Sequence, residues 1–269
     1  MGFGFASLVA GPLMQMLIAK YGLVENFVIL ACIYAVVMTA SALYLEPPKQ
    51  ETAAGKGQFK AKMPEHVQYT VKEAMHTWQF YALWWIFFTN ITCGIGLLAV
   101  ASPMAQEVIG MSPIAAASMV GIIGLLNGGG RIVWSTISDY IGRANTYLAF
   151  FVIEIVAFYL LGGVNESFMF QLLVFIIITC YGGGFSCMPA YLSDLFGTKQ
   201  LSAIHGRILT AWGLAGIAGP LLLSVIYERT HSYSFTLYFF SACFVVSLLL
   251  AAVLKLKGKT TYVVKKRFD

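Results

Sequence analysis

The chain has 269 residues, of which 59% are hydrophobic and 11% are charged, and its mean hydropathy is +0.77. A soluble domain carries roughly 25% charged residues, so this composition excludes the soluble classes and is typical of a polytopic membrane protein. The net charge of +5 is modest, and its distribution among the loops accounts for it without nucleic-acid binding.

The apolar residues form long segments that contain glycine, proline and aromatic side chains. Transmembrane strands would be shorter and would alternate in polarity, so these segments predict helices. We therefore expect an all-α polytopic membrane protein with about eight transmembrane helices. The segments cover approximately residues 2–20, 26–45, 78–100, 114–138, 145–163, 167–190, 203–227 and 233–254.

The longest polar stretch, residues 46–77, separates two groups of helices. It contains Pro47-Pro48 and mixed lysine and glutamate, and it predicts a connecting loop with a short amphipathic piece near Val67 to Met75. The resulting organisation has four parts: two helices in 1–45, the loop 46–77, six helices in 78–256 and a basic tail in 257–269.

Lysine and arginine are distributed unevenly between the two sides of the predicted bundle. Fourteen fall in the long loop, in two later turns on the same side and in the tail, whereas the alternate loops hold only Lys20 and Arg229. Because cytoplasmic loops are enriched in these residues, we expect the loop 46–77 and both termini to be cytoplasmic. The membrane is then the cytoplasmic membrane, meaning the inner or plasma membrane.

A short internal repeat relates the two ends of the chain. Residues 10–13 and residues 218–221 both read AGPL, and in each case a phenylalanine that opens the next segment, Phe27 or Phe235, follows the proline by fifteen residues. The separation between the two AGPL copies predicts a repeat of six helices, which is the size of one half of a two-fold-symmetric transporter.

Two motifs carry a resemblance to a known family. The turn SDYIGR, Ser138 to Arg143, resembles the major facilitator signature G-x-x-x-D-x-x-G-R, with Ser135 at the first glycine position. The stretch from Tyr181 to Pro220 is similar to helices ten and eleven of the oxalate:formate antiporter family, which is related to the monocarboxylate transporters. The resemblance implies a major facilitator fold in which this chain corresponds to helices five to twelve of twelve, without the first four.

The resemblance also implies a cytoplasmic latch that holds the outward-open state. Its members would be Asp139, Gly142 and Arg143 in the turn, with Asp194 and Arg207 beside the next cytoplasmic loop. An aspartate at a helix C-terminus is poorly placed for the helix dipole, so Asp139 is expected to pair with a basic neighbour such as Arg143. The alternative is a solvated turn with a weak surface pair.

Arg131 is the charged residue of an otherwise apolar segment, which is a costly position in lipid. It lies eight residues, or roughly 12 Å of helix, before Asp139, near the membrane midplane. Asn127 is one turn earlier on the same face, and Gly128 to Gly130 allow close approach of another helix or a ligand. A buried guanidinium favours a planar carboxylate, and the resemblance assigns this role to an arginine in this helix. The alternative is a permanently paired structural arginine.

The chain departs from its relatives in the segment TAWGLAG, where Trp212 stands at the position of an expected second cation, a lysine. With one embedded cation, a dianion would leave one charge uncompensated at a cost of several kcal/mol. A monocarboxylate such as lactate, pyruvate or formate is therefore favoured over oxalate, and Trp212 would contact its short aliphatic part.

Further candidates are weaker. Glu154 lies at a depth in the membrane similar to that of Arg131, so it is a candidate for proton coupling or for pairing with Arg131. Two alternatives are equally favoured: the Glu154 side chain contacts a neighbouring helix, or its carboxyl is protonated and lies near lipid. Asn90, Gln15 and Tyr181 are candidates for lining the substrate cavity, and for Asn90 hydrogen bonding between helices is the alternative.

These observations predict a secondary active transporter of small carboxylates that works by alternating access, with Arg131 as the anion anchor. Its partners would be the carboxylate, protons or a counter-transported anion, and the lipid bilayer. The sequence contains no nucleophile set, phosphate loop or metal cluster, so neither an enzyme nor a cofactor is expected. The alternative is a truncated, non-transporting membrane fragment, because Met1 starts inside the helix that corresponds to helix five.

Overall fold

A computed structural model describes residues 10, 13, 14, 16–45 and 68–265, with the backbone alone for 258–265. Seven helices in this part of the chain are long and apolar enough to cross a membrane, which confirms the all-α polytopic fold. The predicted first segment, 2–20, lies largely outside the described residues. The helices are α2 (Leu23–Tyr44), α3 (Val71–Met75), α4 (Trp78–Glu107), α5 (Pro113–Ile141), α6 (Arg143–Leu161), α7 (Ser167–Phe196), α8 (Leu201–Thr230) and α9 (Tyr233–Lys265).

The chain divides into two compact units, the larger of which contains α3 to α9 and the smaller α2. In the smaller unit, α2 follows Gly22, whose φ of 94° is a conformation that residues with a side chain rarely adopt. The Gly22 amide donates to the Ile18 carbonyl at 3.0 Å, so a tight turn leads into α2. The mean hydropathy of α2 is 2.2, as expected for a helix surrounded by lipid or other helices.

In the larger unit, most helices begin after a residue whose side chain accepts hydrogen bonds from the first backbone amides. Thr77 caps α4, Ser112 caps α5 just before Pro113, and the Glu166 carboxylate accepts from two amides at the start of α7. Gly142, with φ 86°, ends α5 and precedes α6 directly. These polar residues mark the points where the chain leaves the apolar core and reverses direction.

Several helices are longer than the apolar segments that predicted them. α4 continues through Pro103 to Glu107, α7 continues to Phe196, and α9 continues to Lys265. A helix of 30 residues is about 45 Å long, whereas the hydrocarbon core is about 30 Å thick. Hydropathy therefore marks the part of each helix that lies in lipid, and the helix itself ends at its cap.

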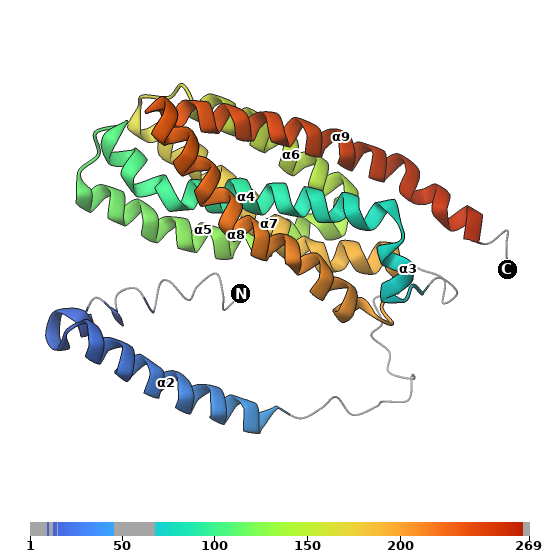
Figure 1. The fold of residues 1–269 in the computed structure, drawn as a ribbon, viewed down its shortest axis with the longest axis horizontal. Helices are drawn as coiled ribbons and strands as arrows, with labels where there is room; N and C mark the ends of the chain where they lie inside the picture. The colour runs from blue at the N-terminus through green and yellow to red at the C-terminus, as the bar shows by residue number, and fades with distance from the viewer. Residues whose placement is uncertain (1–9, 11–12, 15, 46–67, 266–269) are drawn as a thin grey trace. The chain divides into compact units, whose positions relative to one another are not determined.

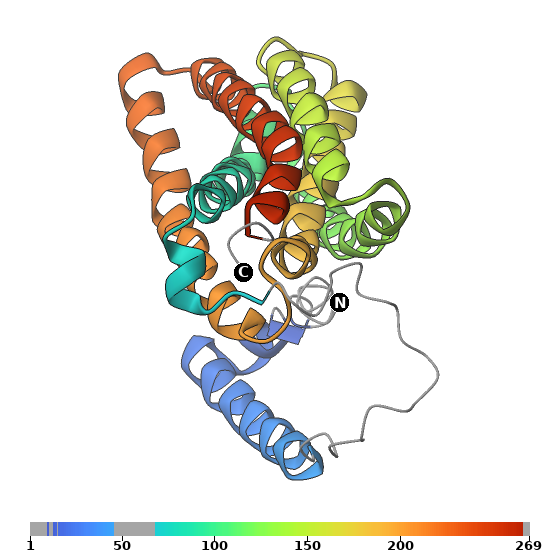
Figure 2. The same cartoon turned by 90° about the vertical axis from the view of Figure 1, so that its right-hand side faces the viewer.

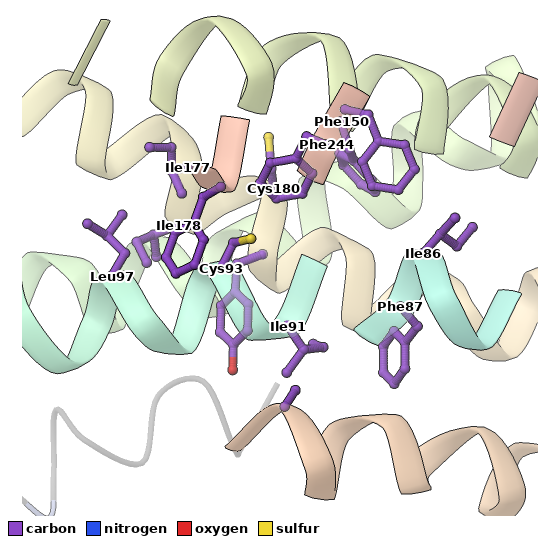
Figure 3. Close-up of a cluster of buried hydrophobic side chains, with 14 of the residues drawn as sticks. Ile86, Phe87, Ile91, Cys93, Leu97, Phe150, Ile177, Ile178, Cys180 and Phe244 are labelled. Carbon is purple, nitrogen blue, oxygen red and sulfur yellow. The ribbon is translucent and has the colours of Figure 1, made fainter. Parts of the chain in front are cut away.

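The larger unit is a bundle in which the helices pack mainly in three pairs, α5 with α7, α4 with α8, and α6 with α9 (Figures 1 and 2). Its core lies where α4, α6, α7 and α9 meet. Figure 3 shows part of this core, with Ile86, Phe87, Ile91, Cys93 and Leu97 of α4, Phe150 of α6, Ile177, Ile178 and Cys180 of α7, and Phe244 of α9.

The short helix α3 confirms the predicted amphipathic piece and is fixed to the loop between α7 and α8. Thr70 and Glu73 form a capping box at its start. The Tyr69 amide donates to the Phe196 carbonyl at 2.9 Å, and the Val71 amide donates to the Gln200 side chain at 2.8 Å. Burial and the nearby Glu73 carboxylate raise the pKa of Tyr69. The last part of the predicted loop 46–77 is therefore ordered against the bundle.

Candidate anion-binding site

Arg131 lies in the middle of α5 and is 9% exposed. It is ten residues, or about 15 Å, from the end of the helix at Ile141. Its Nε donates to the Asn127 Oδ1 one turn earlier at 3.5 Å, the long limit of a hydrogen bond. The predicted pairing of Asn127 and Arg131 on one helix face is therefore present.

The Arg131 guanidinium lies over the Phe185 ring of α7, with 4.8 Å between the guanidinium carbon and the ring centroid. A cation within about 6 Å of an aromatic ring is attracted by the negative charge of the ring face. Phe185 therefore stabilises the charged side chain of Arg131 without supplying a hydrogen-bond acceptor.

Phe185 also connects Arg131 with Trp212 of α8. The Phe185 and Trp212 rings meet edge to face with centroids 6.0 Å apart, and Phe185 packs against Phe87 of α4 at 5.7 Å. Trp212 is 38% exposed, so part of the indole lies on the surface of the described structure. Phe185 has no sequence feature that predicts this contact, although it follows the candidate Tyr181 by one helical turn.

Tyr181 lies where α7 crosses α4 and is 5% exposed. Its ring occupies the space beside Gly94 of α4 that a side chain at that position would fill. Tyr181 also interacts electrostatically with Arg131. The structure therefore places the predicted residues Arg131, Asn127, Tyr181 and Trp212 around one region, with Phe185 between them.

Hydrogen bonds and a glycine contact hold α5 against α7 at the level of Arg131. Ser186 is within 3.1 Å of the Arg131 carbonyl oxygen, and Ser135 donates to Ser186 at 2.8 Å. A Cβ added at Gly130 would lie 2.6 Å from the Thr179 carbonyl oxygen, so the two backbones are already in contact there. Small residues and hydroxyls are the usual means of joining helices in lipid. The backbone that carries the arginine is thereby fixed.

Glu154 of α6 is fully buried, and its hydrogen-bond partner is Asn90 of α4. The Asn90 Nδ2 lies 3.1 Å from one carboxyl oxygen of Glu154 and 3.3 Å from the other. The ion pairs of the described residues do not include one between Glu154 and Arg131. The structure thus joins Asn90 and Glu154, which were predicted as candidates for separate roles.

A second group of predicted residues meets where α5 turns into α6, here called the Asp139 end of the bundle. Arg143 forms an ion pair with Asp139 at 2.5 Å, donates to the Ser138 hydroxyl at 2.8 Å and lies 3.9 Å from the Asp194 carboxylate of α7. Gly142 makes this geometry accessible because its φ of 86° lets α6 begin immediately after α5. One arginine therefore bridges α5 and α7.

Two predicted residues belong neither to these two groups nor to the Asn90–Glu154 pair. Arg207 is exposed on α8, and the ion pairs described for residues 68–257 do not include it. Gln15 lies outside the described residues.

Comparison with known proteins places this architecture in a family. A profile of the Major Facilitator Superfamily matches residues 1–184 and 131–268, two overlapping ranges that together cover nearly the whole chain. This chain belongs to the Major Facilitator Superfamily. Together with the seven apolar helices, this membership makes it an integral membrane protein.

Two relatives illustrate the range of the similarity. This superfamily member is 28% identical over 218 residues to the uncharacterized MFS-type transporter YhjX of Escherichia coli K12, covering 80% of this chain and 52% of the relative. It is 27% identical over 221 residues to the oxalate:formate antiporter of Oxalobacter formigenes, covering 81% of this chain and 51% of the relative. The chain thus spans about half the length of the curated relatives it matches.

Proposed function

We propose that this superfamily member takes part in secondary active transport of small carboxylates, with Arg131 as the anion anchor. The observation that carries the proposal is a guanidinium buried in the middle of a membrane helix, with its Nε bonded to Asn127 and its carbon over the Phe185 ring. A charge at this depth is expensive and is expected to have a function. The similarity to an oxalate:formate antiporter supports carboxylates as the substrate class.

A monocarboxylate such as lactate, pyruvate or formate is favoured over oxalate. In the described membrane helices, Arg131 is the one buried basic side chain, and Trp212 occupies the position of an expected second cation. One guanidinium balances one carboxylate, whereas the second charge of a dianion would be buried without compensation. The rings of Phe185 and Trp212 offer an apolar surface to a short aliphatic substituent.

Transport would proceed by alternating access, with the Asp139 end as a latch. The Asp139, Arg143 and Asp194 side chains link α5 to α7, so they stabilise one arrangement of these helix ends over another. The lysine and arginine distribution supports a cytoplasmic location for this end and for both termini, in an inner or plasma membrane. We propose an organisation with two helices in 1–45, a linking loop in 46–77 and a six-helix half in 78–256.

A second candidate is a chain that binds the anion but does not transport it without further helices. The observation in its favour is that the chain spans about half the length of its matched relatives. Major facilitator transporters build their substrate cavity between two halves, so a single half would supply one wall of it.

The test is uptake of labelled lactate, pyruvate, formate and oxalate into proteoliposomes containing the chain. Binding of the same anions to the purified protein in detergent is measured in parallel. We expect binding of monocarboxylates that is lost in Arg131→Ala and weakened in Arg131→Lys, because lysine keeps the charge but not the bidentate geometry.

Arg229→Ala is the matched control, since Arg229 is an exposed arginine in the last turn of α8. Binding that survives Arg131→Ala would overturn the assignment. Binding without uptake would favour the second candidate over transport by this chain alone.

A further inference from the structure

The described part of the larger unit buries two charged side chains of opposite sign, Arg131 and Glu154. Arg131 lies about 15 Å along α5 from Ile141, and Glu154 lies about 17 Å along α6 from Arg143. Because Ile141 and Arg143 flank the same turn, the two charges are at nearly the same depth in the bundle. At this depth the membrane offers little water, so both charges require compensation.

Among the described residues, the groups that interact with Glu154 include titratable side chains but no basic one. Its carboxyl interacts electrostatically with Cys93 of α4, Tyr147 of α6 and Cys180 of α7. On α9, which packs against α6, Cys243 interacts with Cys93. The hydrogen bonds to Glu154 come from the neutral amide of Asn90. Within the described part of the chain, the carboxyl therefore has an amide partner and forms no ion pair.

The Asn90 amide is arranged in a way that suits both protonation states of Glu154. Its Nδ2 is shared between the two carboxyl oxygens, and its buried Oδ1 has no hydrogen-bond partner. An ionised carboxylate can only accept, whereas a protonated carboxyl also donates. When Glu154 is protonated and the amide turns both atoms toward it, the carboxyl donates to Oδ1 and accepts from Nδ2. Proton binding thus satisfies an otherwise unpaired acceptor.

We propose that Glu154 and Asn90 form a proton-binding site that is loaded together with the carboxylate at Arg131. The charges balance in both states. In the empty state, positive Arg131 is offset by ionised Glu154. In the loaded state, one proton from water is bound to a Glu154 oxygen, and Arg131 is offset by the bound monocarboxylate. The buried site stays neutral throughout, so one proton accompanies each anion. This inference deepens the proposed function, on which its coupling step rests.

The two sites contact one another through the glycines of α7. Gly184 lies against the Asn90 side chain, and its carbonyl accepts from the Tyr147 hydroxyl at 2.5 Å. Two residues earlier in the same stretch, Gly182 lies against Asn127, the partner of Arg131. A displacement of this stretch changes the contacts of both asparagines together.

The first test examines the proton site without any anion. Infrared difference spectra of the purified chain are recorded across a pH series, using the carbonyl band of a protonated carboxylic acid. We expect a buried-acid band that disappears with rising pH and that is absent in Glu154→Gln, which keeps the size and the hydrogen bond to Asn90. The control is Glu228→Gln, an exposed glutamate of α8, which leaves the band in place. A spectrum in which Glu154→Gln removes no titrating band overturns the proton site.

The second test examines coupling. Proton uptake on addition of lactate is measured with a pH-sensitive dye in weakly buffered detergent solution, together with the lactate Kd as a function of pH. We expect one proton per anion, and a Kd that rises by about tenfold per pH unit above the titration of Glu154, since each 1.4 kcal/mol is a factor of ten. In Glu154→Gln, proton uptake is lost and the Kd stays at its low-pH value.

The two tests distinguish a failure of the proton coupling from a failure of the proposed carboxylate transport. Lactate binding with no proton uptake in the wild type overturns the coupling and leaves the proposed function standing. Absence of any carboxylate binding overturns the proposed function, and the infrared titration still decides whether Glu154 holds a proton. Equal pH dependence in the wild type and Glu154→Gln also overturns the coupling.

Discussion

Two adjacent glycines of α5 provide the sharpest test of the packing that holds the anion anchor. A Cβ at Gly130 would lie 2.6 Å from the carbonyl oxygen and 2.7 Å from the Cα of Thr179, whereas a Cβ at Gly129 would meet nothing within 4 Å. Ordinary contacts begin at 3.4 Å, so in Gly130→Ala the backbones of α5 and α7 have to separate by about 0.8 Å.

The expected cost of this separation is about 1–3 kcal/mol, the usual range for an overpacked core. Both alanines gain the same intrinsic helix preference of about 1 kcal/mol, so the difference between the two variants isolates the packing term. For a chain of this size, the difference corresponds to a melting temperature lower by roughly 2–12 °C in Gly130→Ala than in Gly129→Ala.

The measurement is thermal unfolding of both variants in the same detergent, followed by tryptophan fluorescence. Carboxylate binding is measured below the transition, because the shift moves the backbone next to Arg131 and is expected to weaken binding in Gly130→Ala alone. Equal stability of the two variants would show that α5 and α7 do not pack as described and would remove the physical basis for a fixed Arg131.

Three further predictions concern the latch, a buried hydrogen bond between α6 and α7, and the cap of α7. Asp139→Asn removes the ion pair with Arg143, and because such surface pairs contribute about 0–1 kcal/mol, stability and anion affinity are expected to stay unchanged. The accessibility of cysteines at the two ends of the bundle to labelling reagents is expected to shift. Unchanged accessibility would contradict the latch. Tyr147→Phe removes the hydrogen bond to the buried Gly184 carbonyl and is expected to lower the free energy of unfolding by about 1–3 kcal/mol. A variant as stable as the wild type in thermal unfolding would show that this hydrogen bond is not formed. Glu166→Ala removes the cap of α7 and is expected to cost about 1 kcal/mol, measured by thermal unfolding, whereas Glu166→Asp should retain most of the stability.

Much of the fold follows from composition and periodicity alone. In lipid every backbone amide and carbonyl must be paired within the segment, so long apolar stretches have to be helices. Polar residues at the boundaries, such as Ser112 and Glu166, then become caps. The same local logic gives Asn127 and Arg131 on one face of α5, because residues four apart are neighbours on any helix.

The contents of the candidate site were only partly predictable. Phe185 has no distinguishing sequence feature among twenty phenylalanines, and only the approach of α7 to α5 places its ring beneath the guanidinium. Similarly, Glu154 and Asn90 are 64 positions apart, and their hydrogen bonds exist because α6 and α4 meet in the core. Depth along a helix can be counted from sequence, but the rotation of a helix about its own axis depends on its neighbours.

The glycines before Arg131 show which properties depend on the sequence alone and which depend on the tertiary structure. By itself the sequence determined that Gly128 to Gly130 would narrow a membrane helix beside a buried charge, since glycine has no side chain wherever it stands. Only the tertiary structure decided that Gly130 lies on the Thr179 backbone while Gly129 faces open space, because close packing between two helices is a property of the pair.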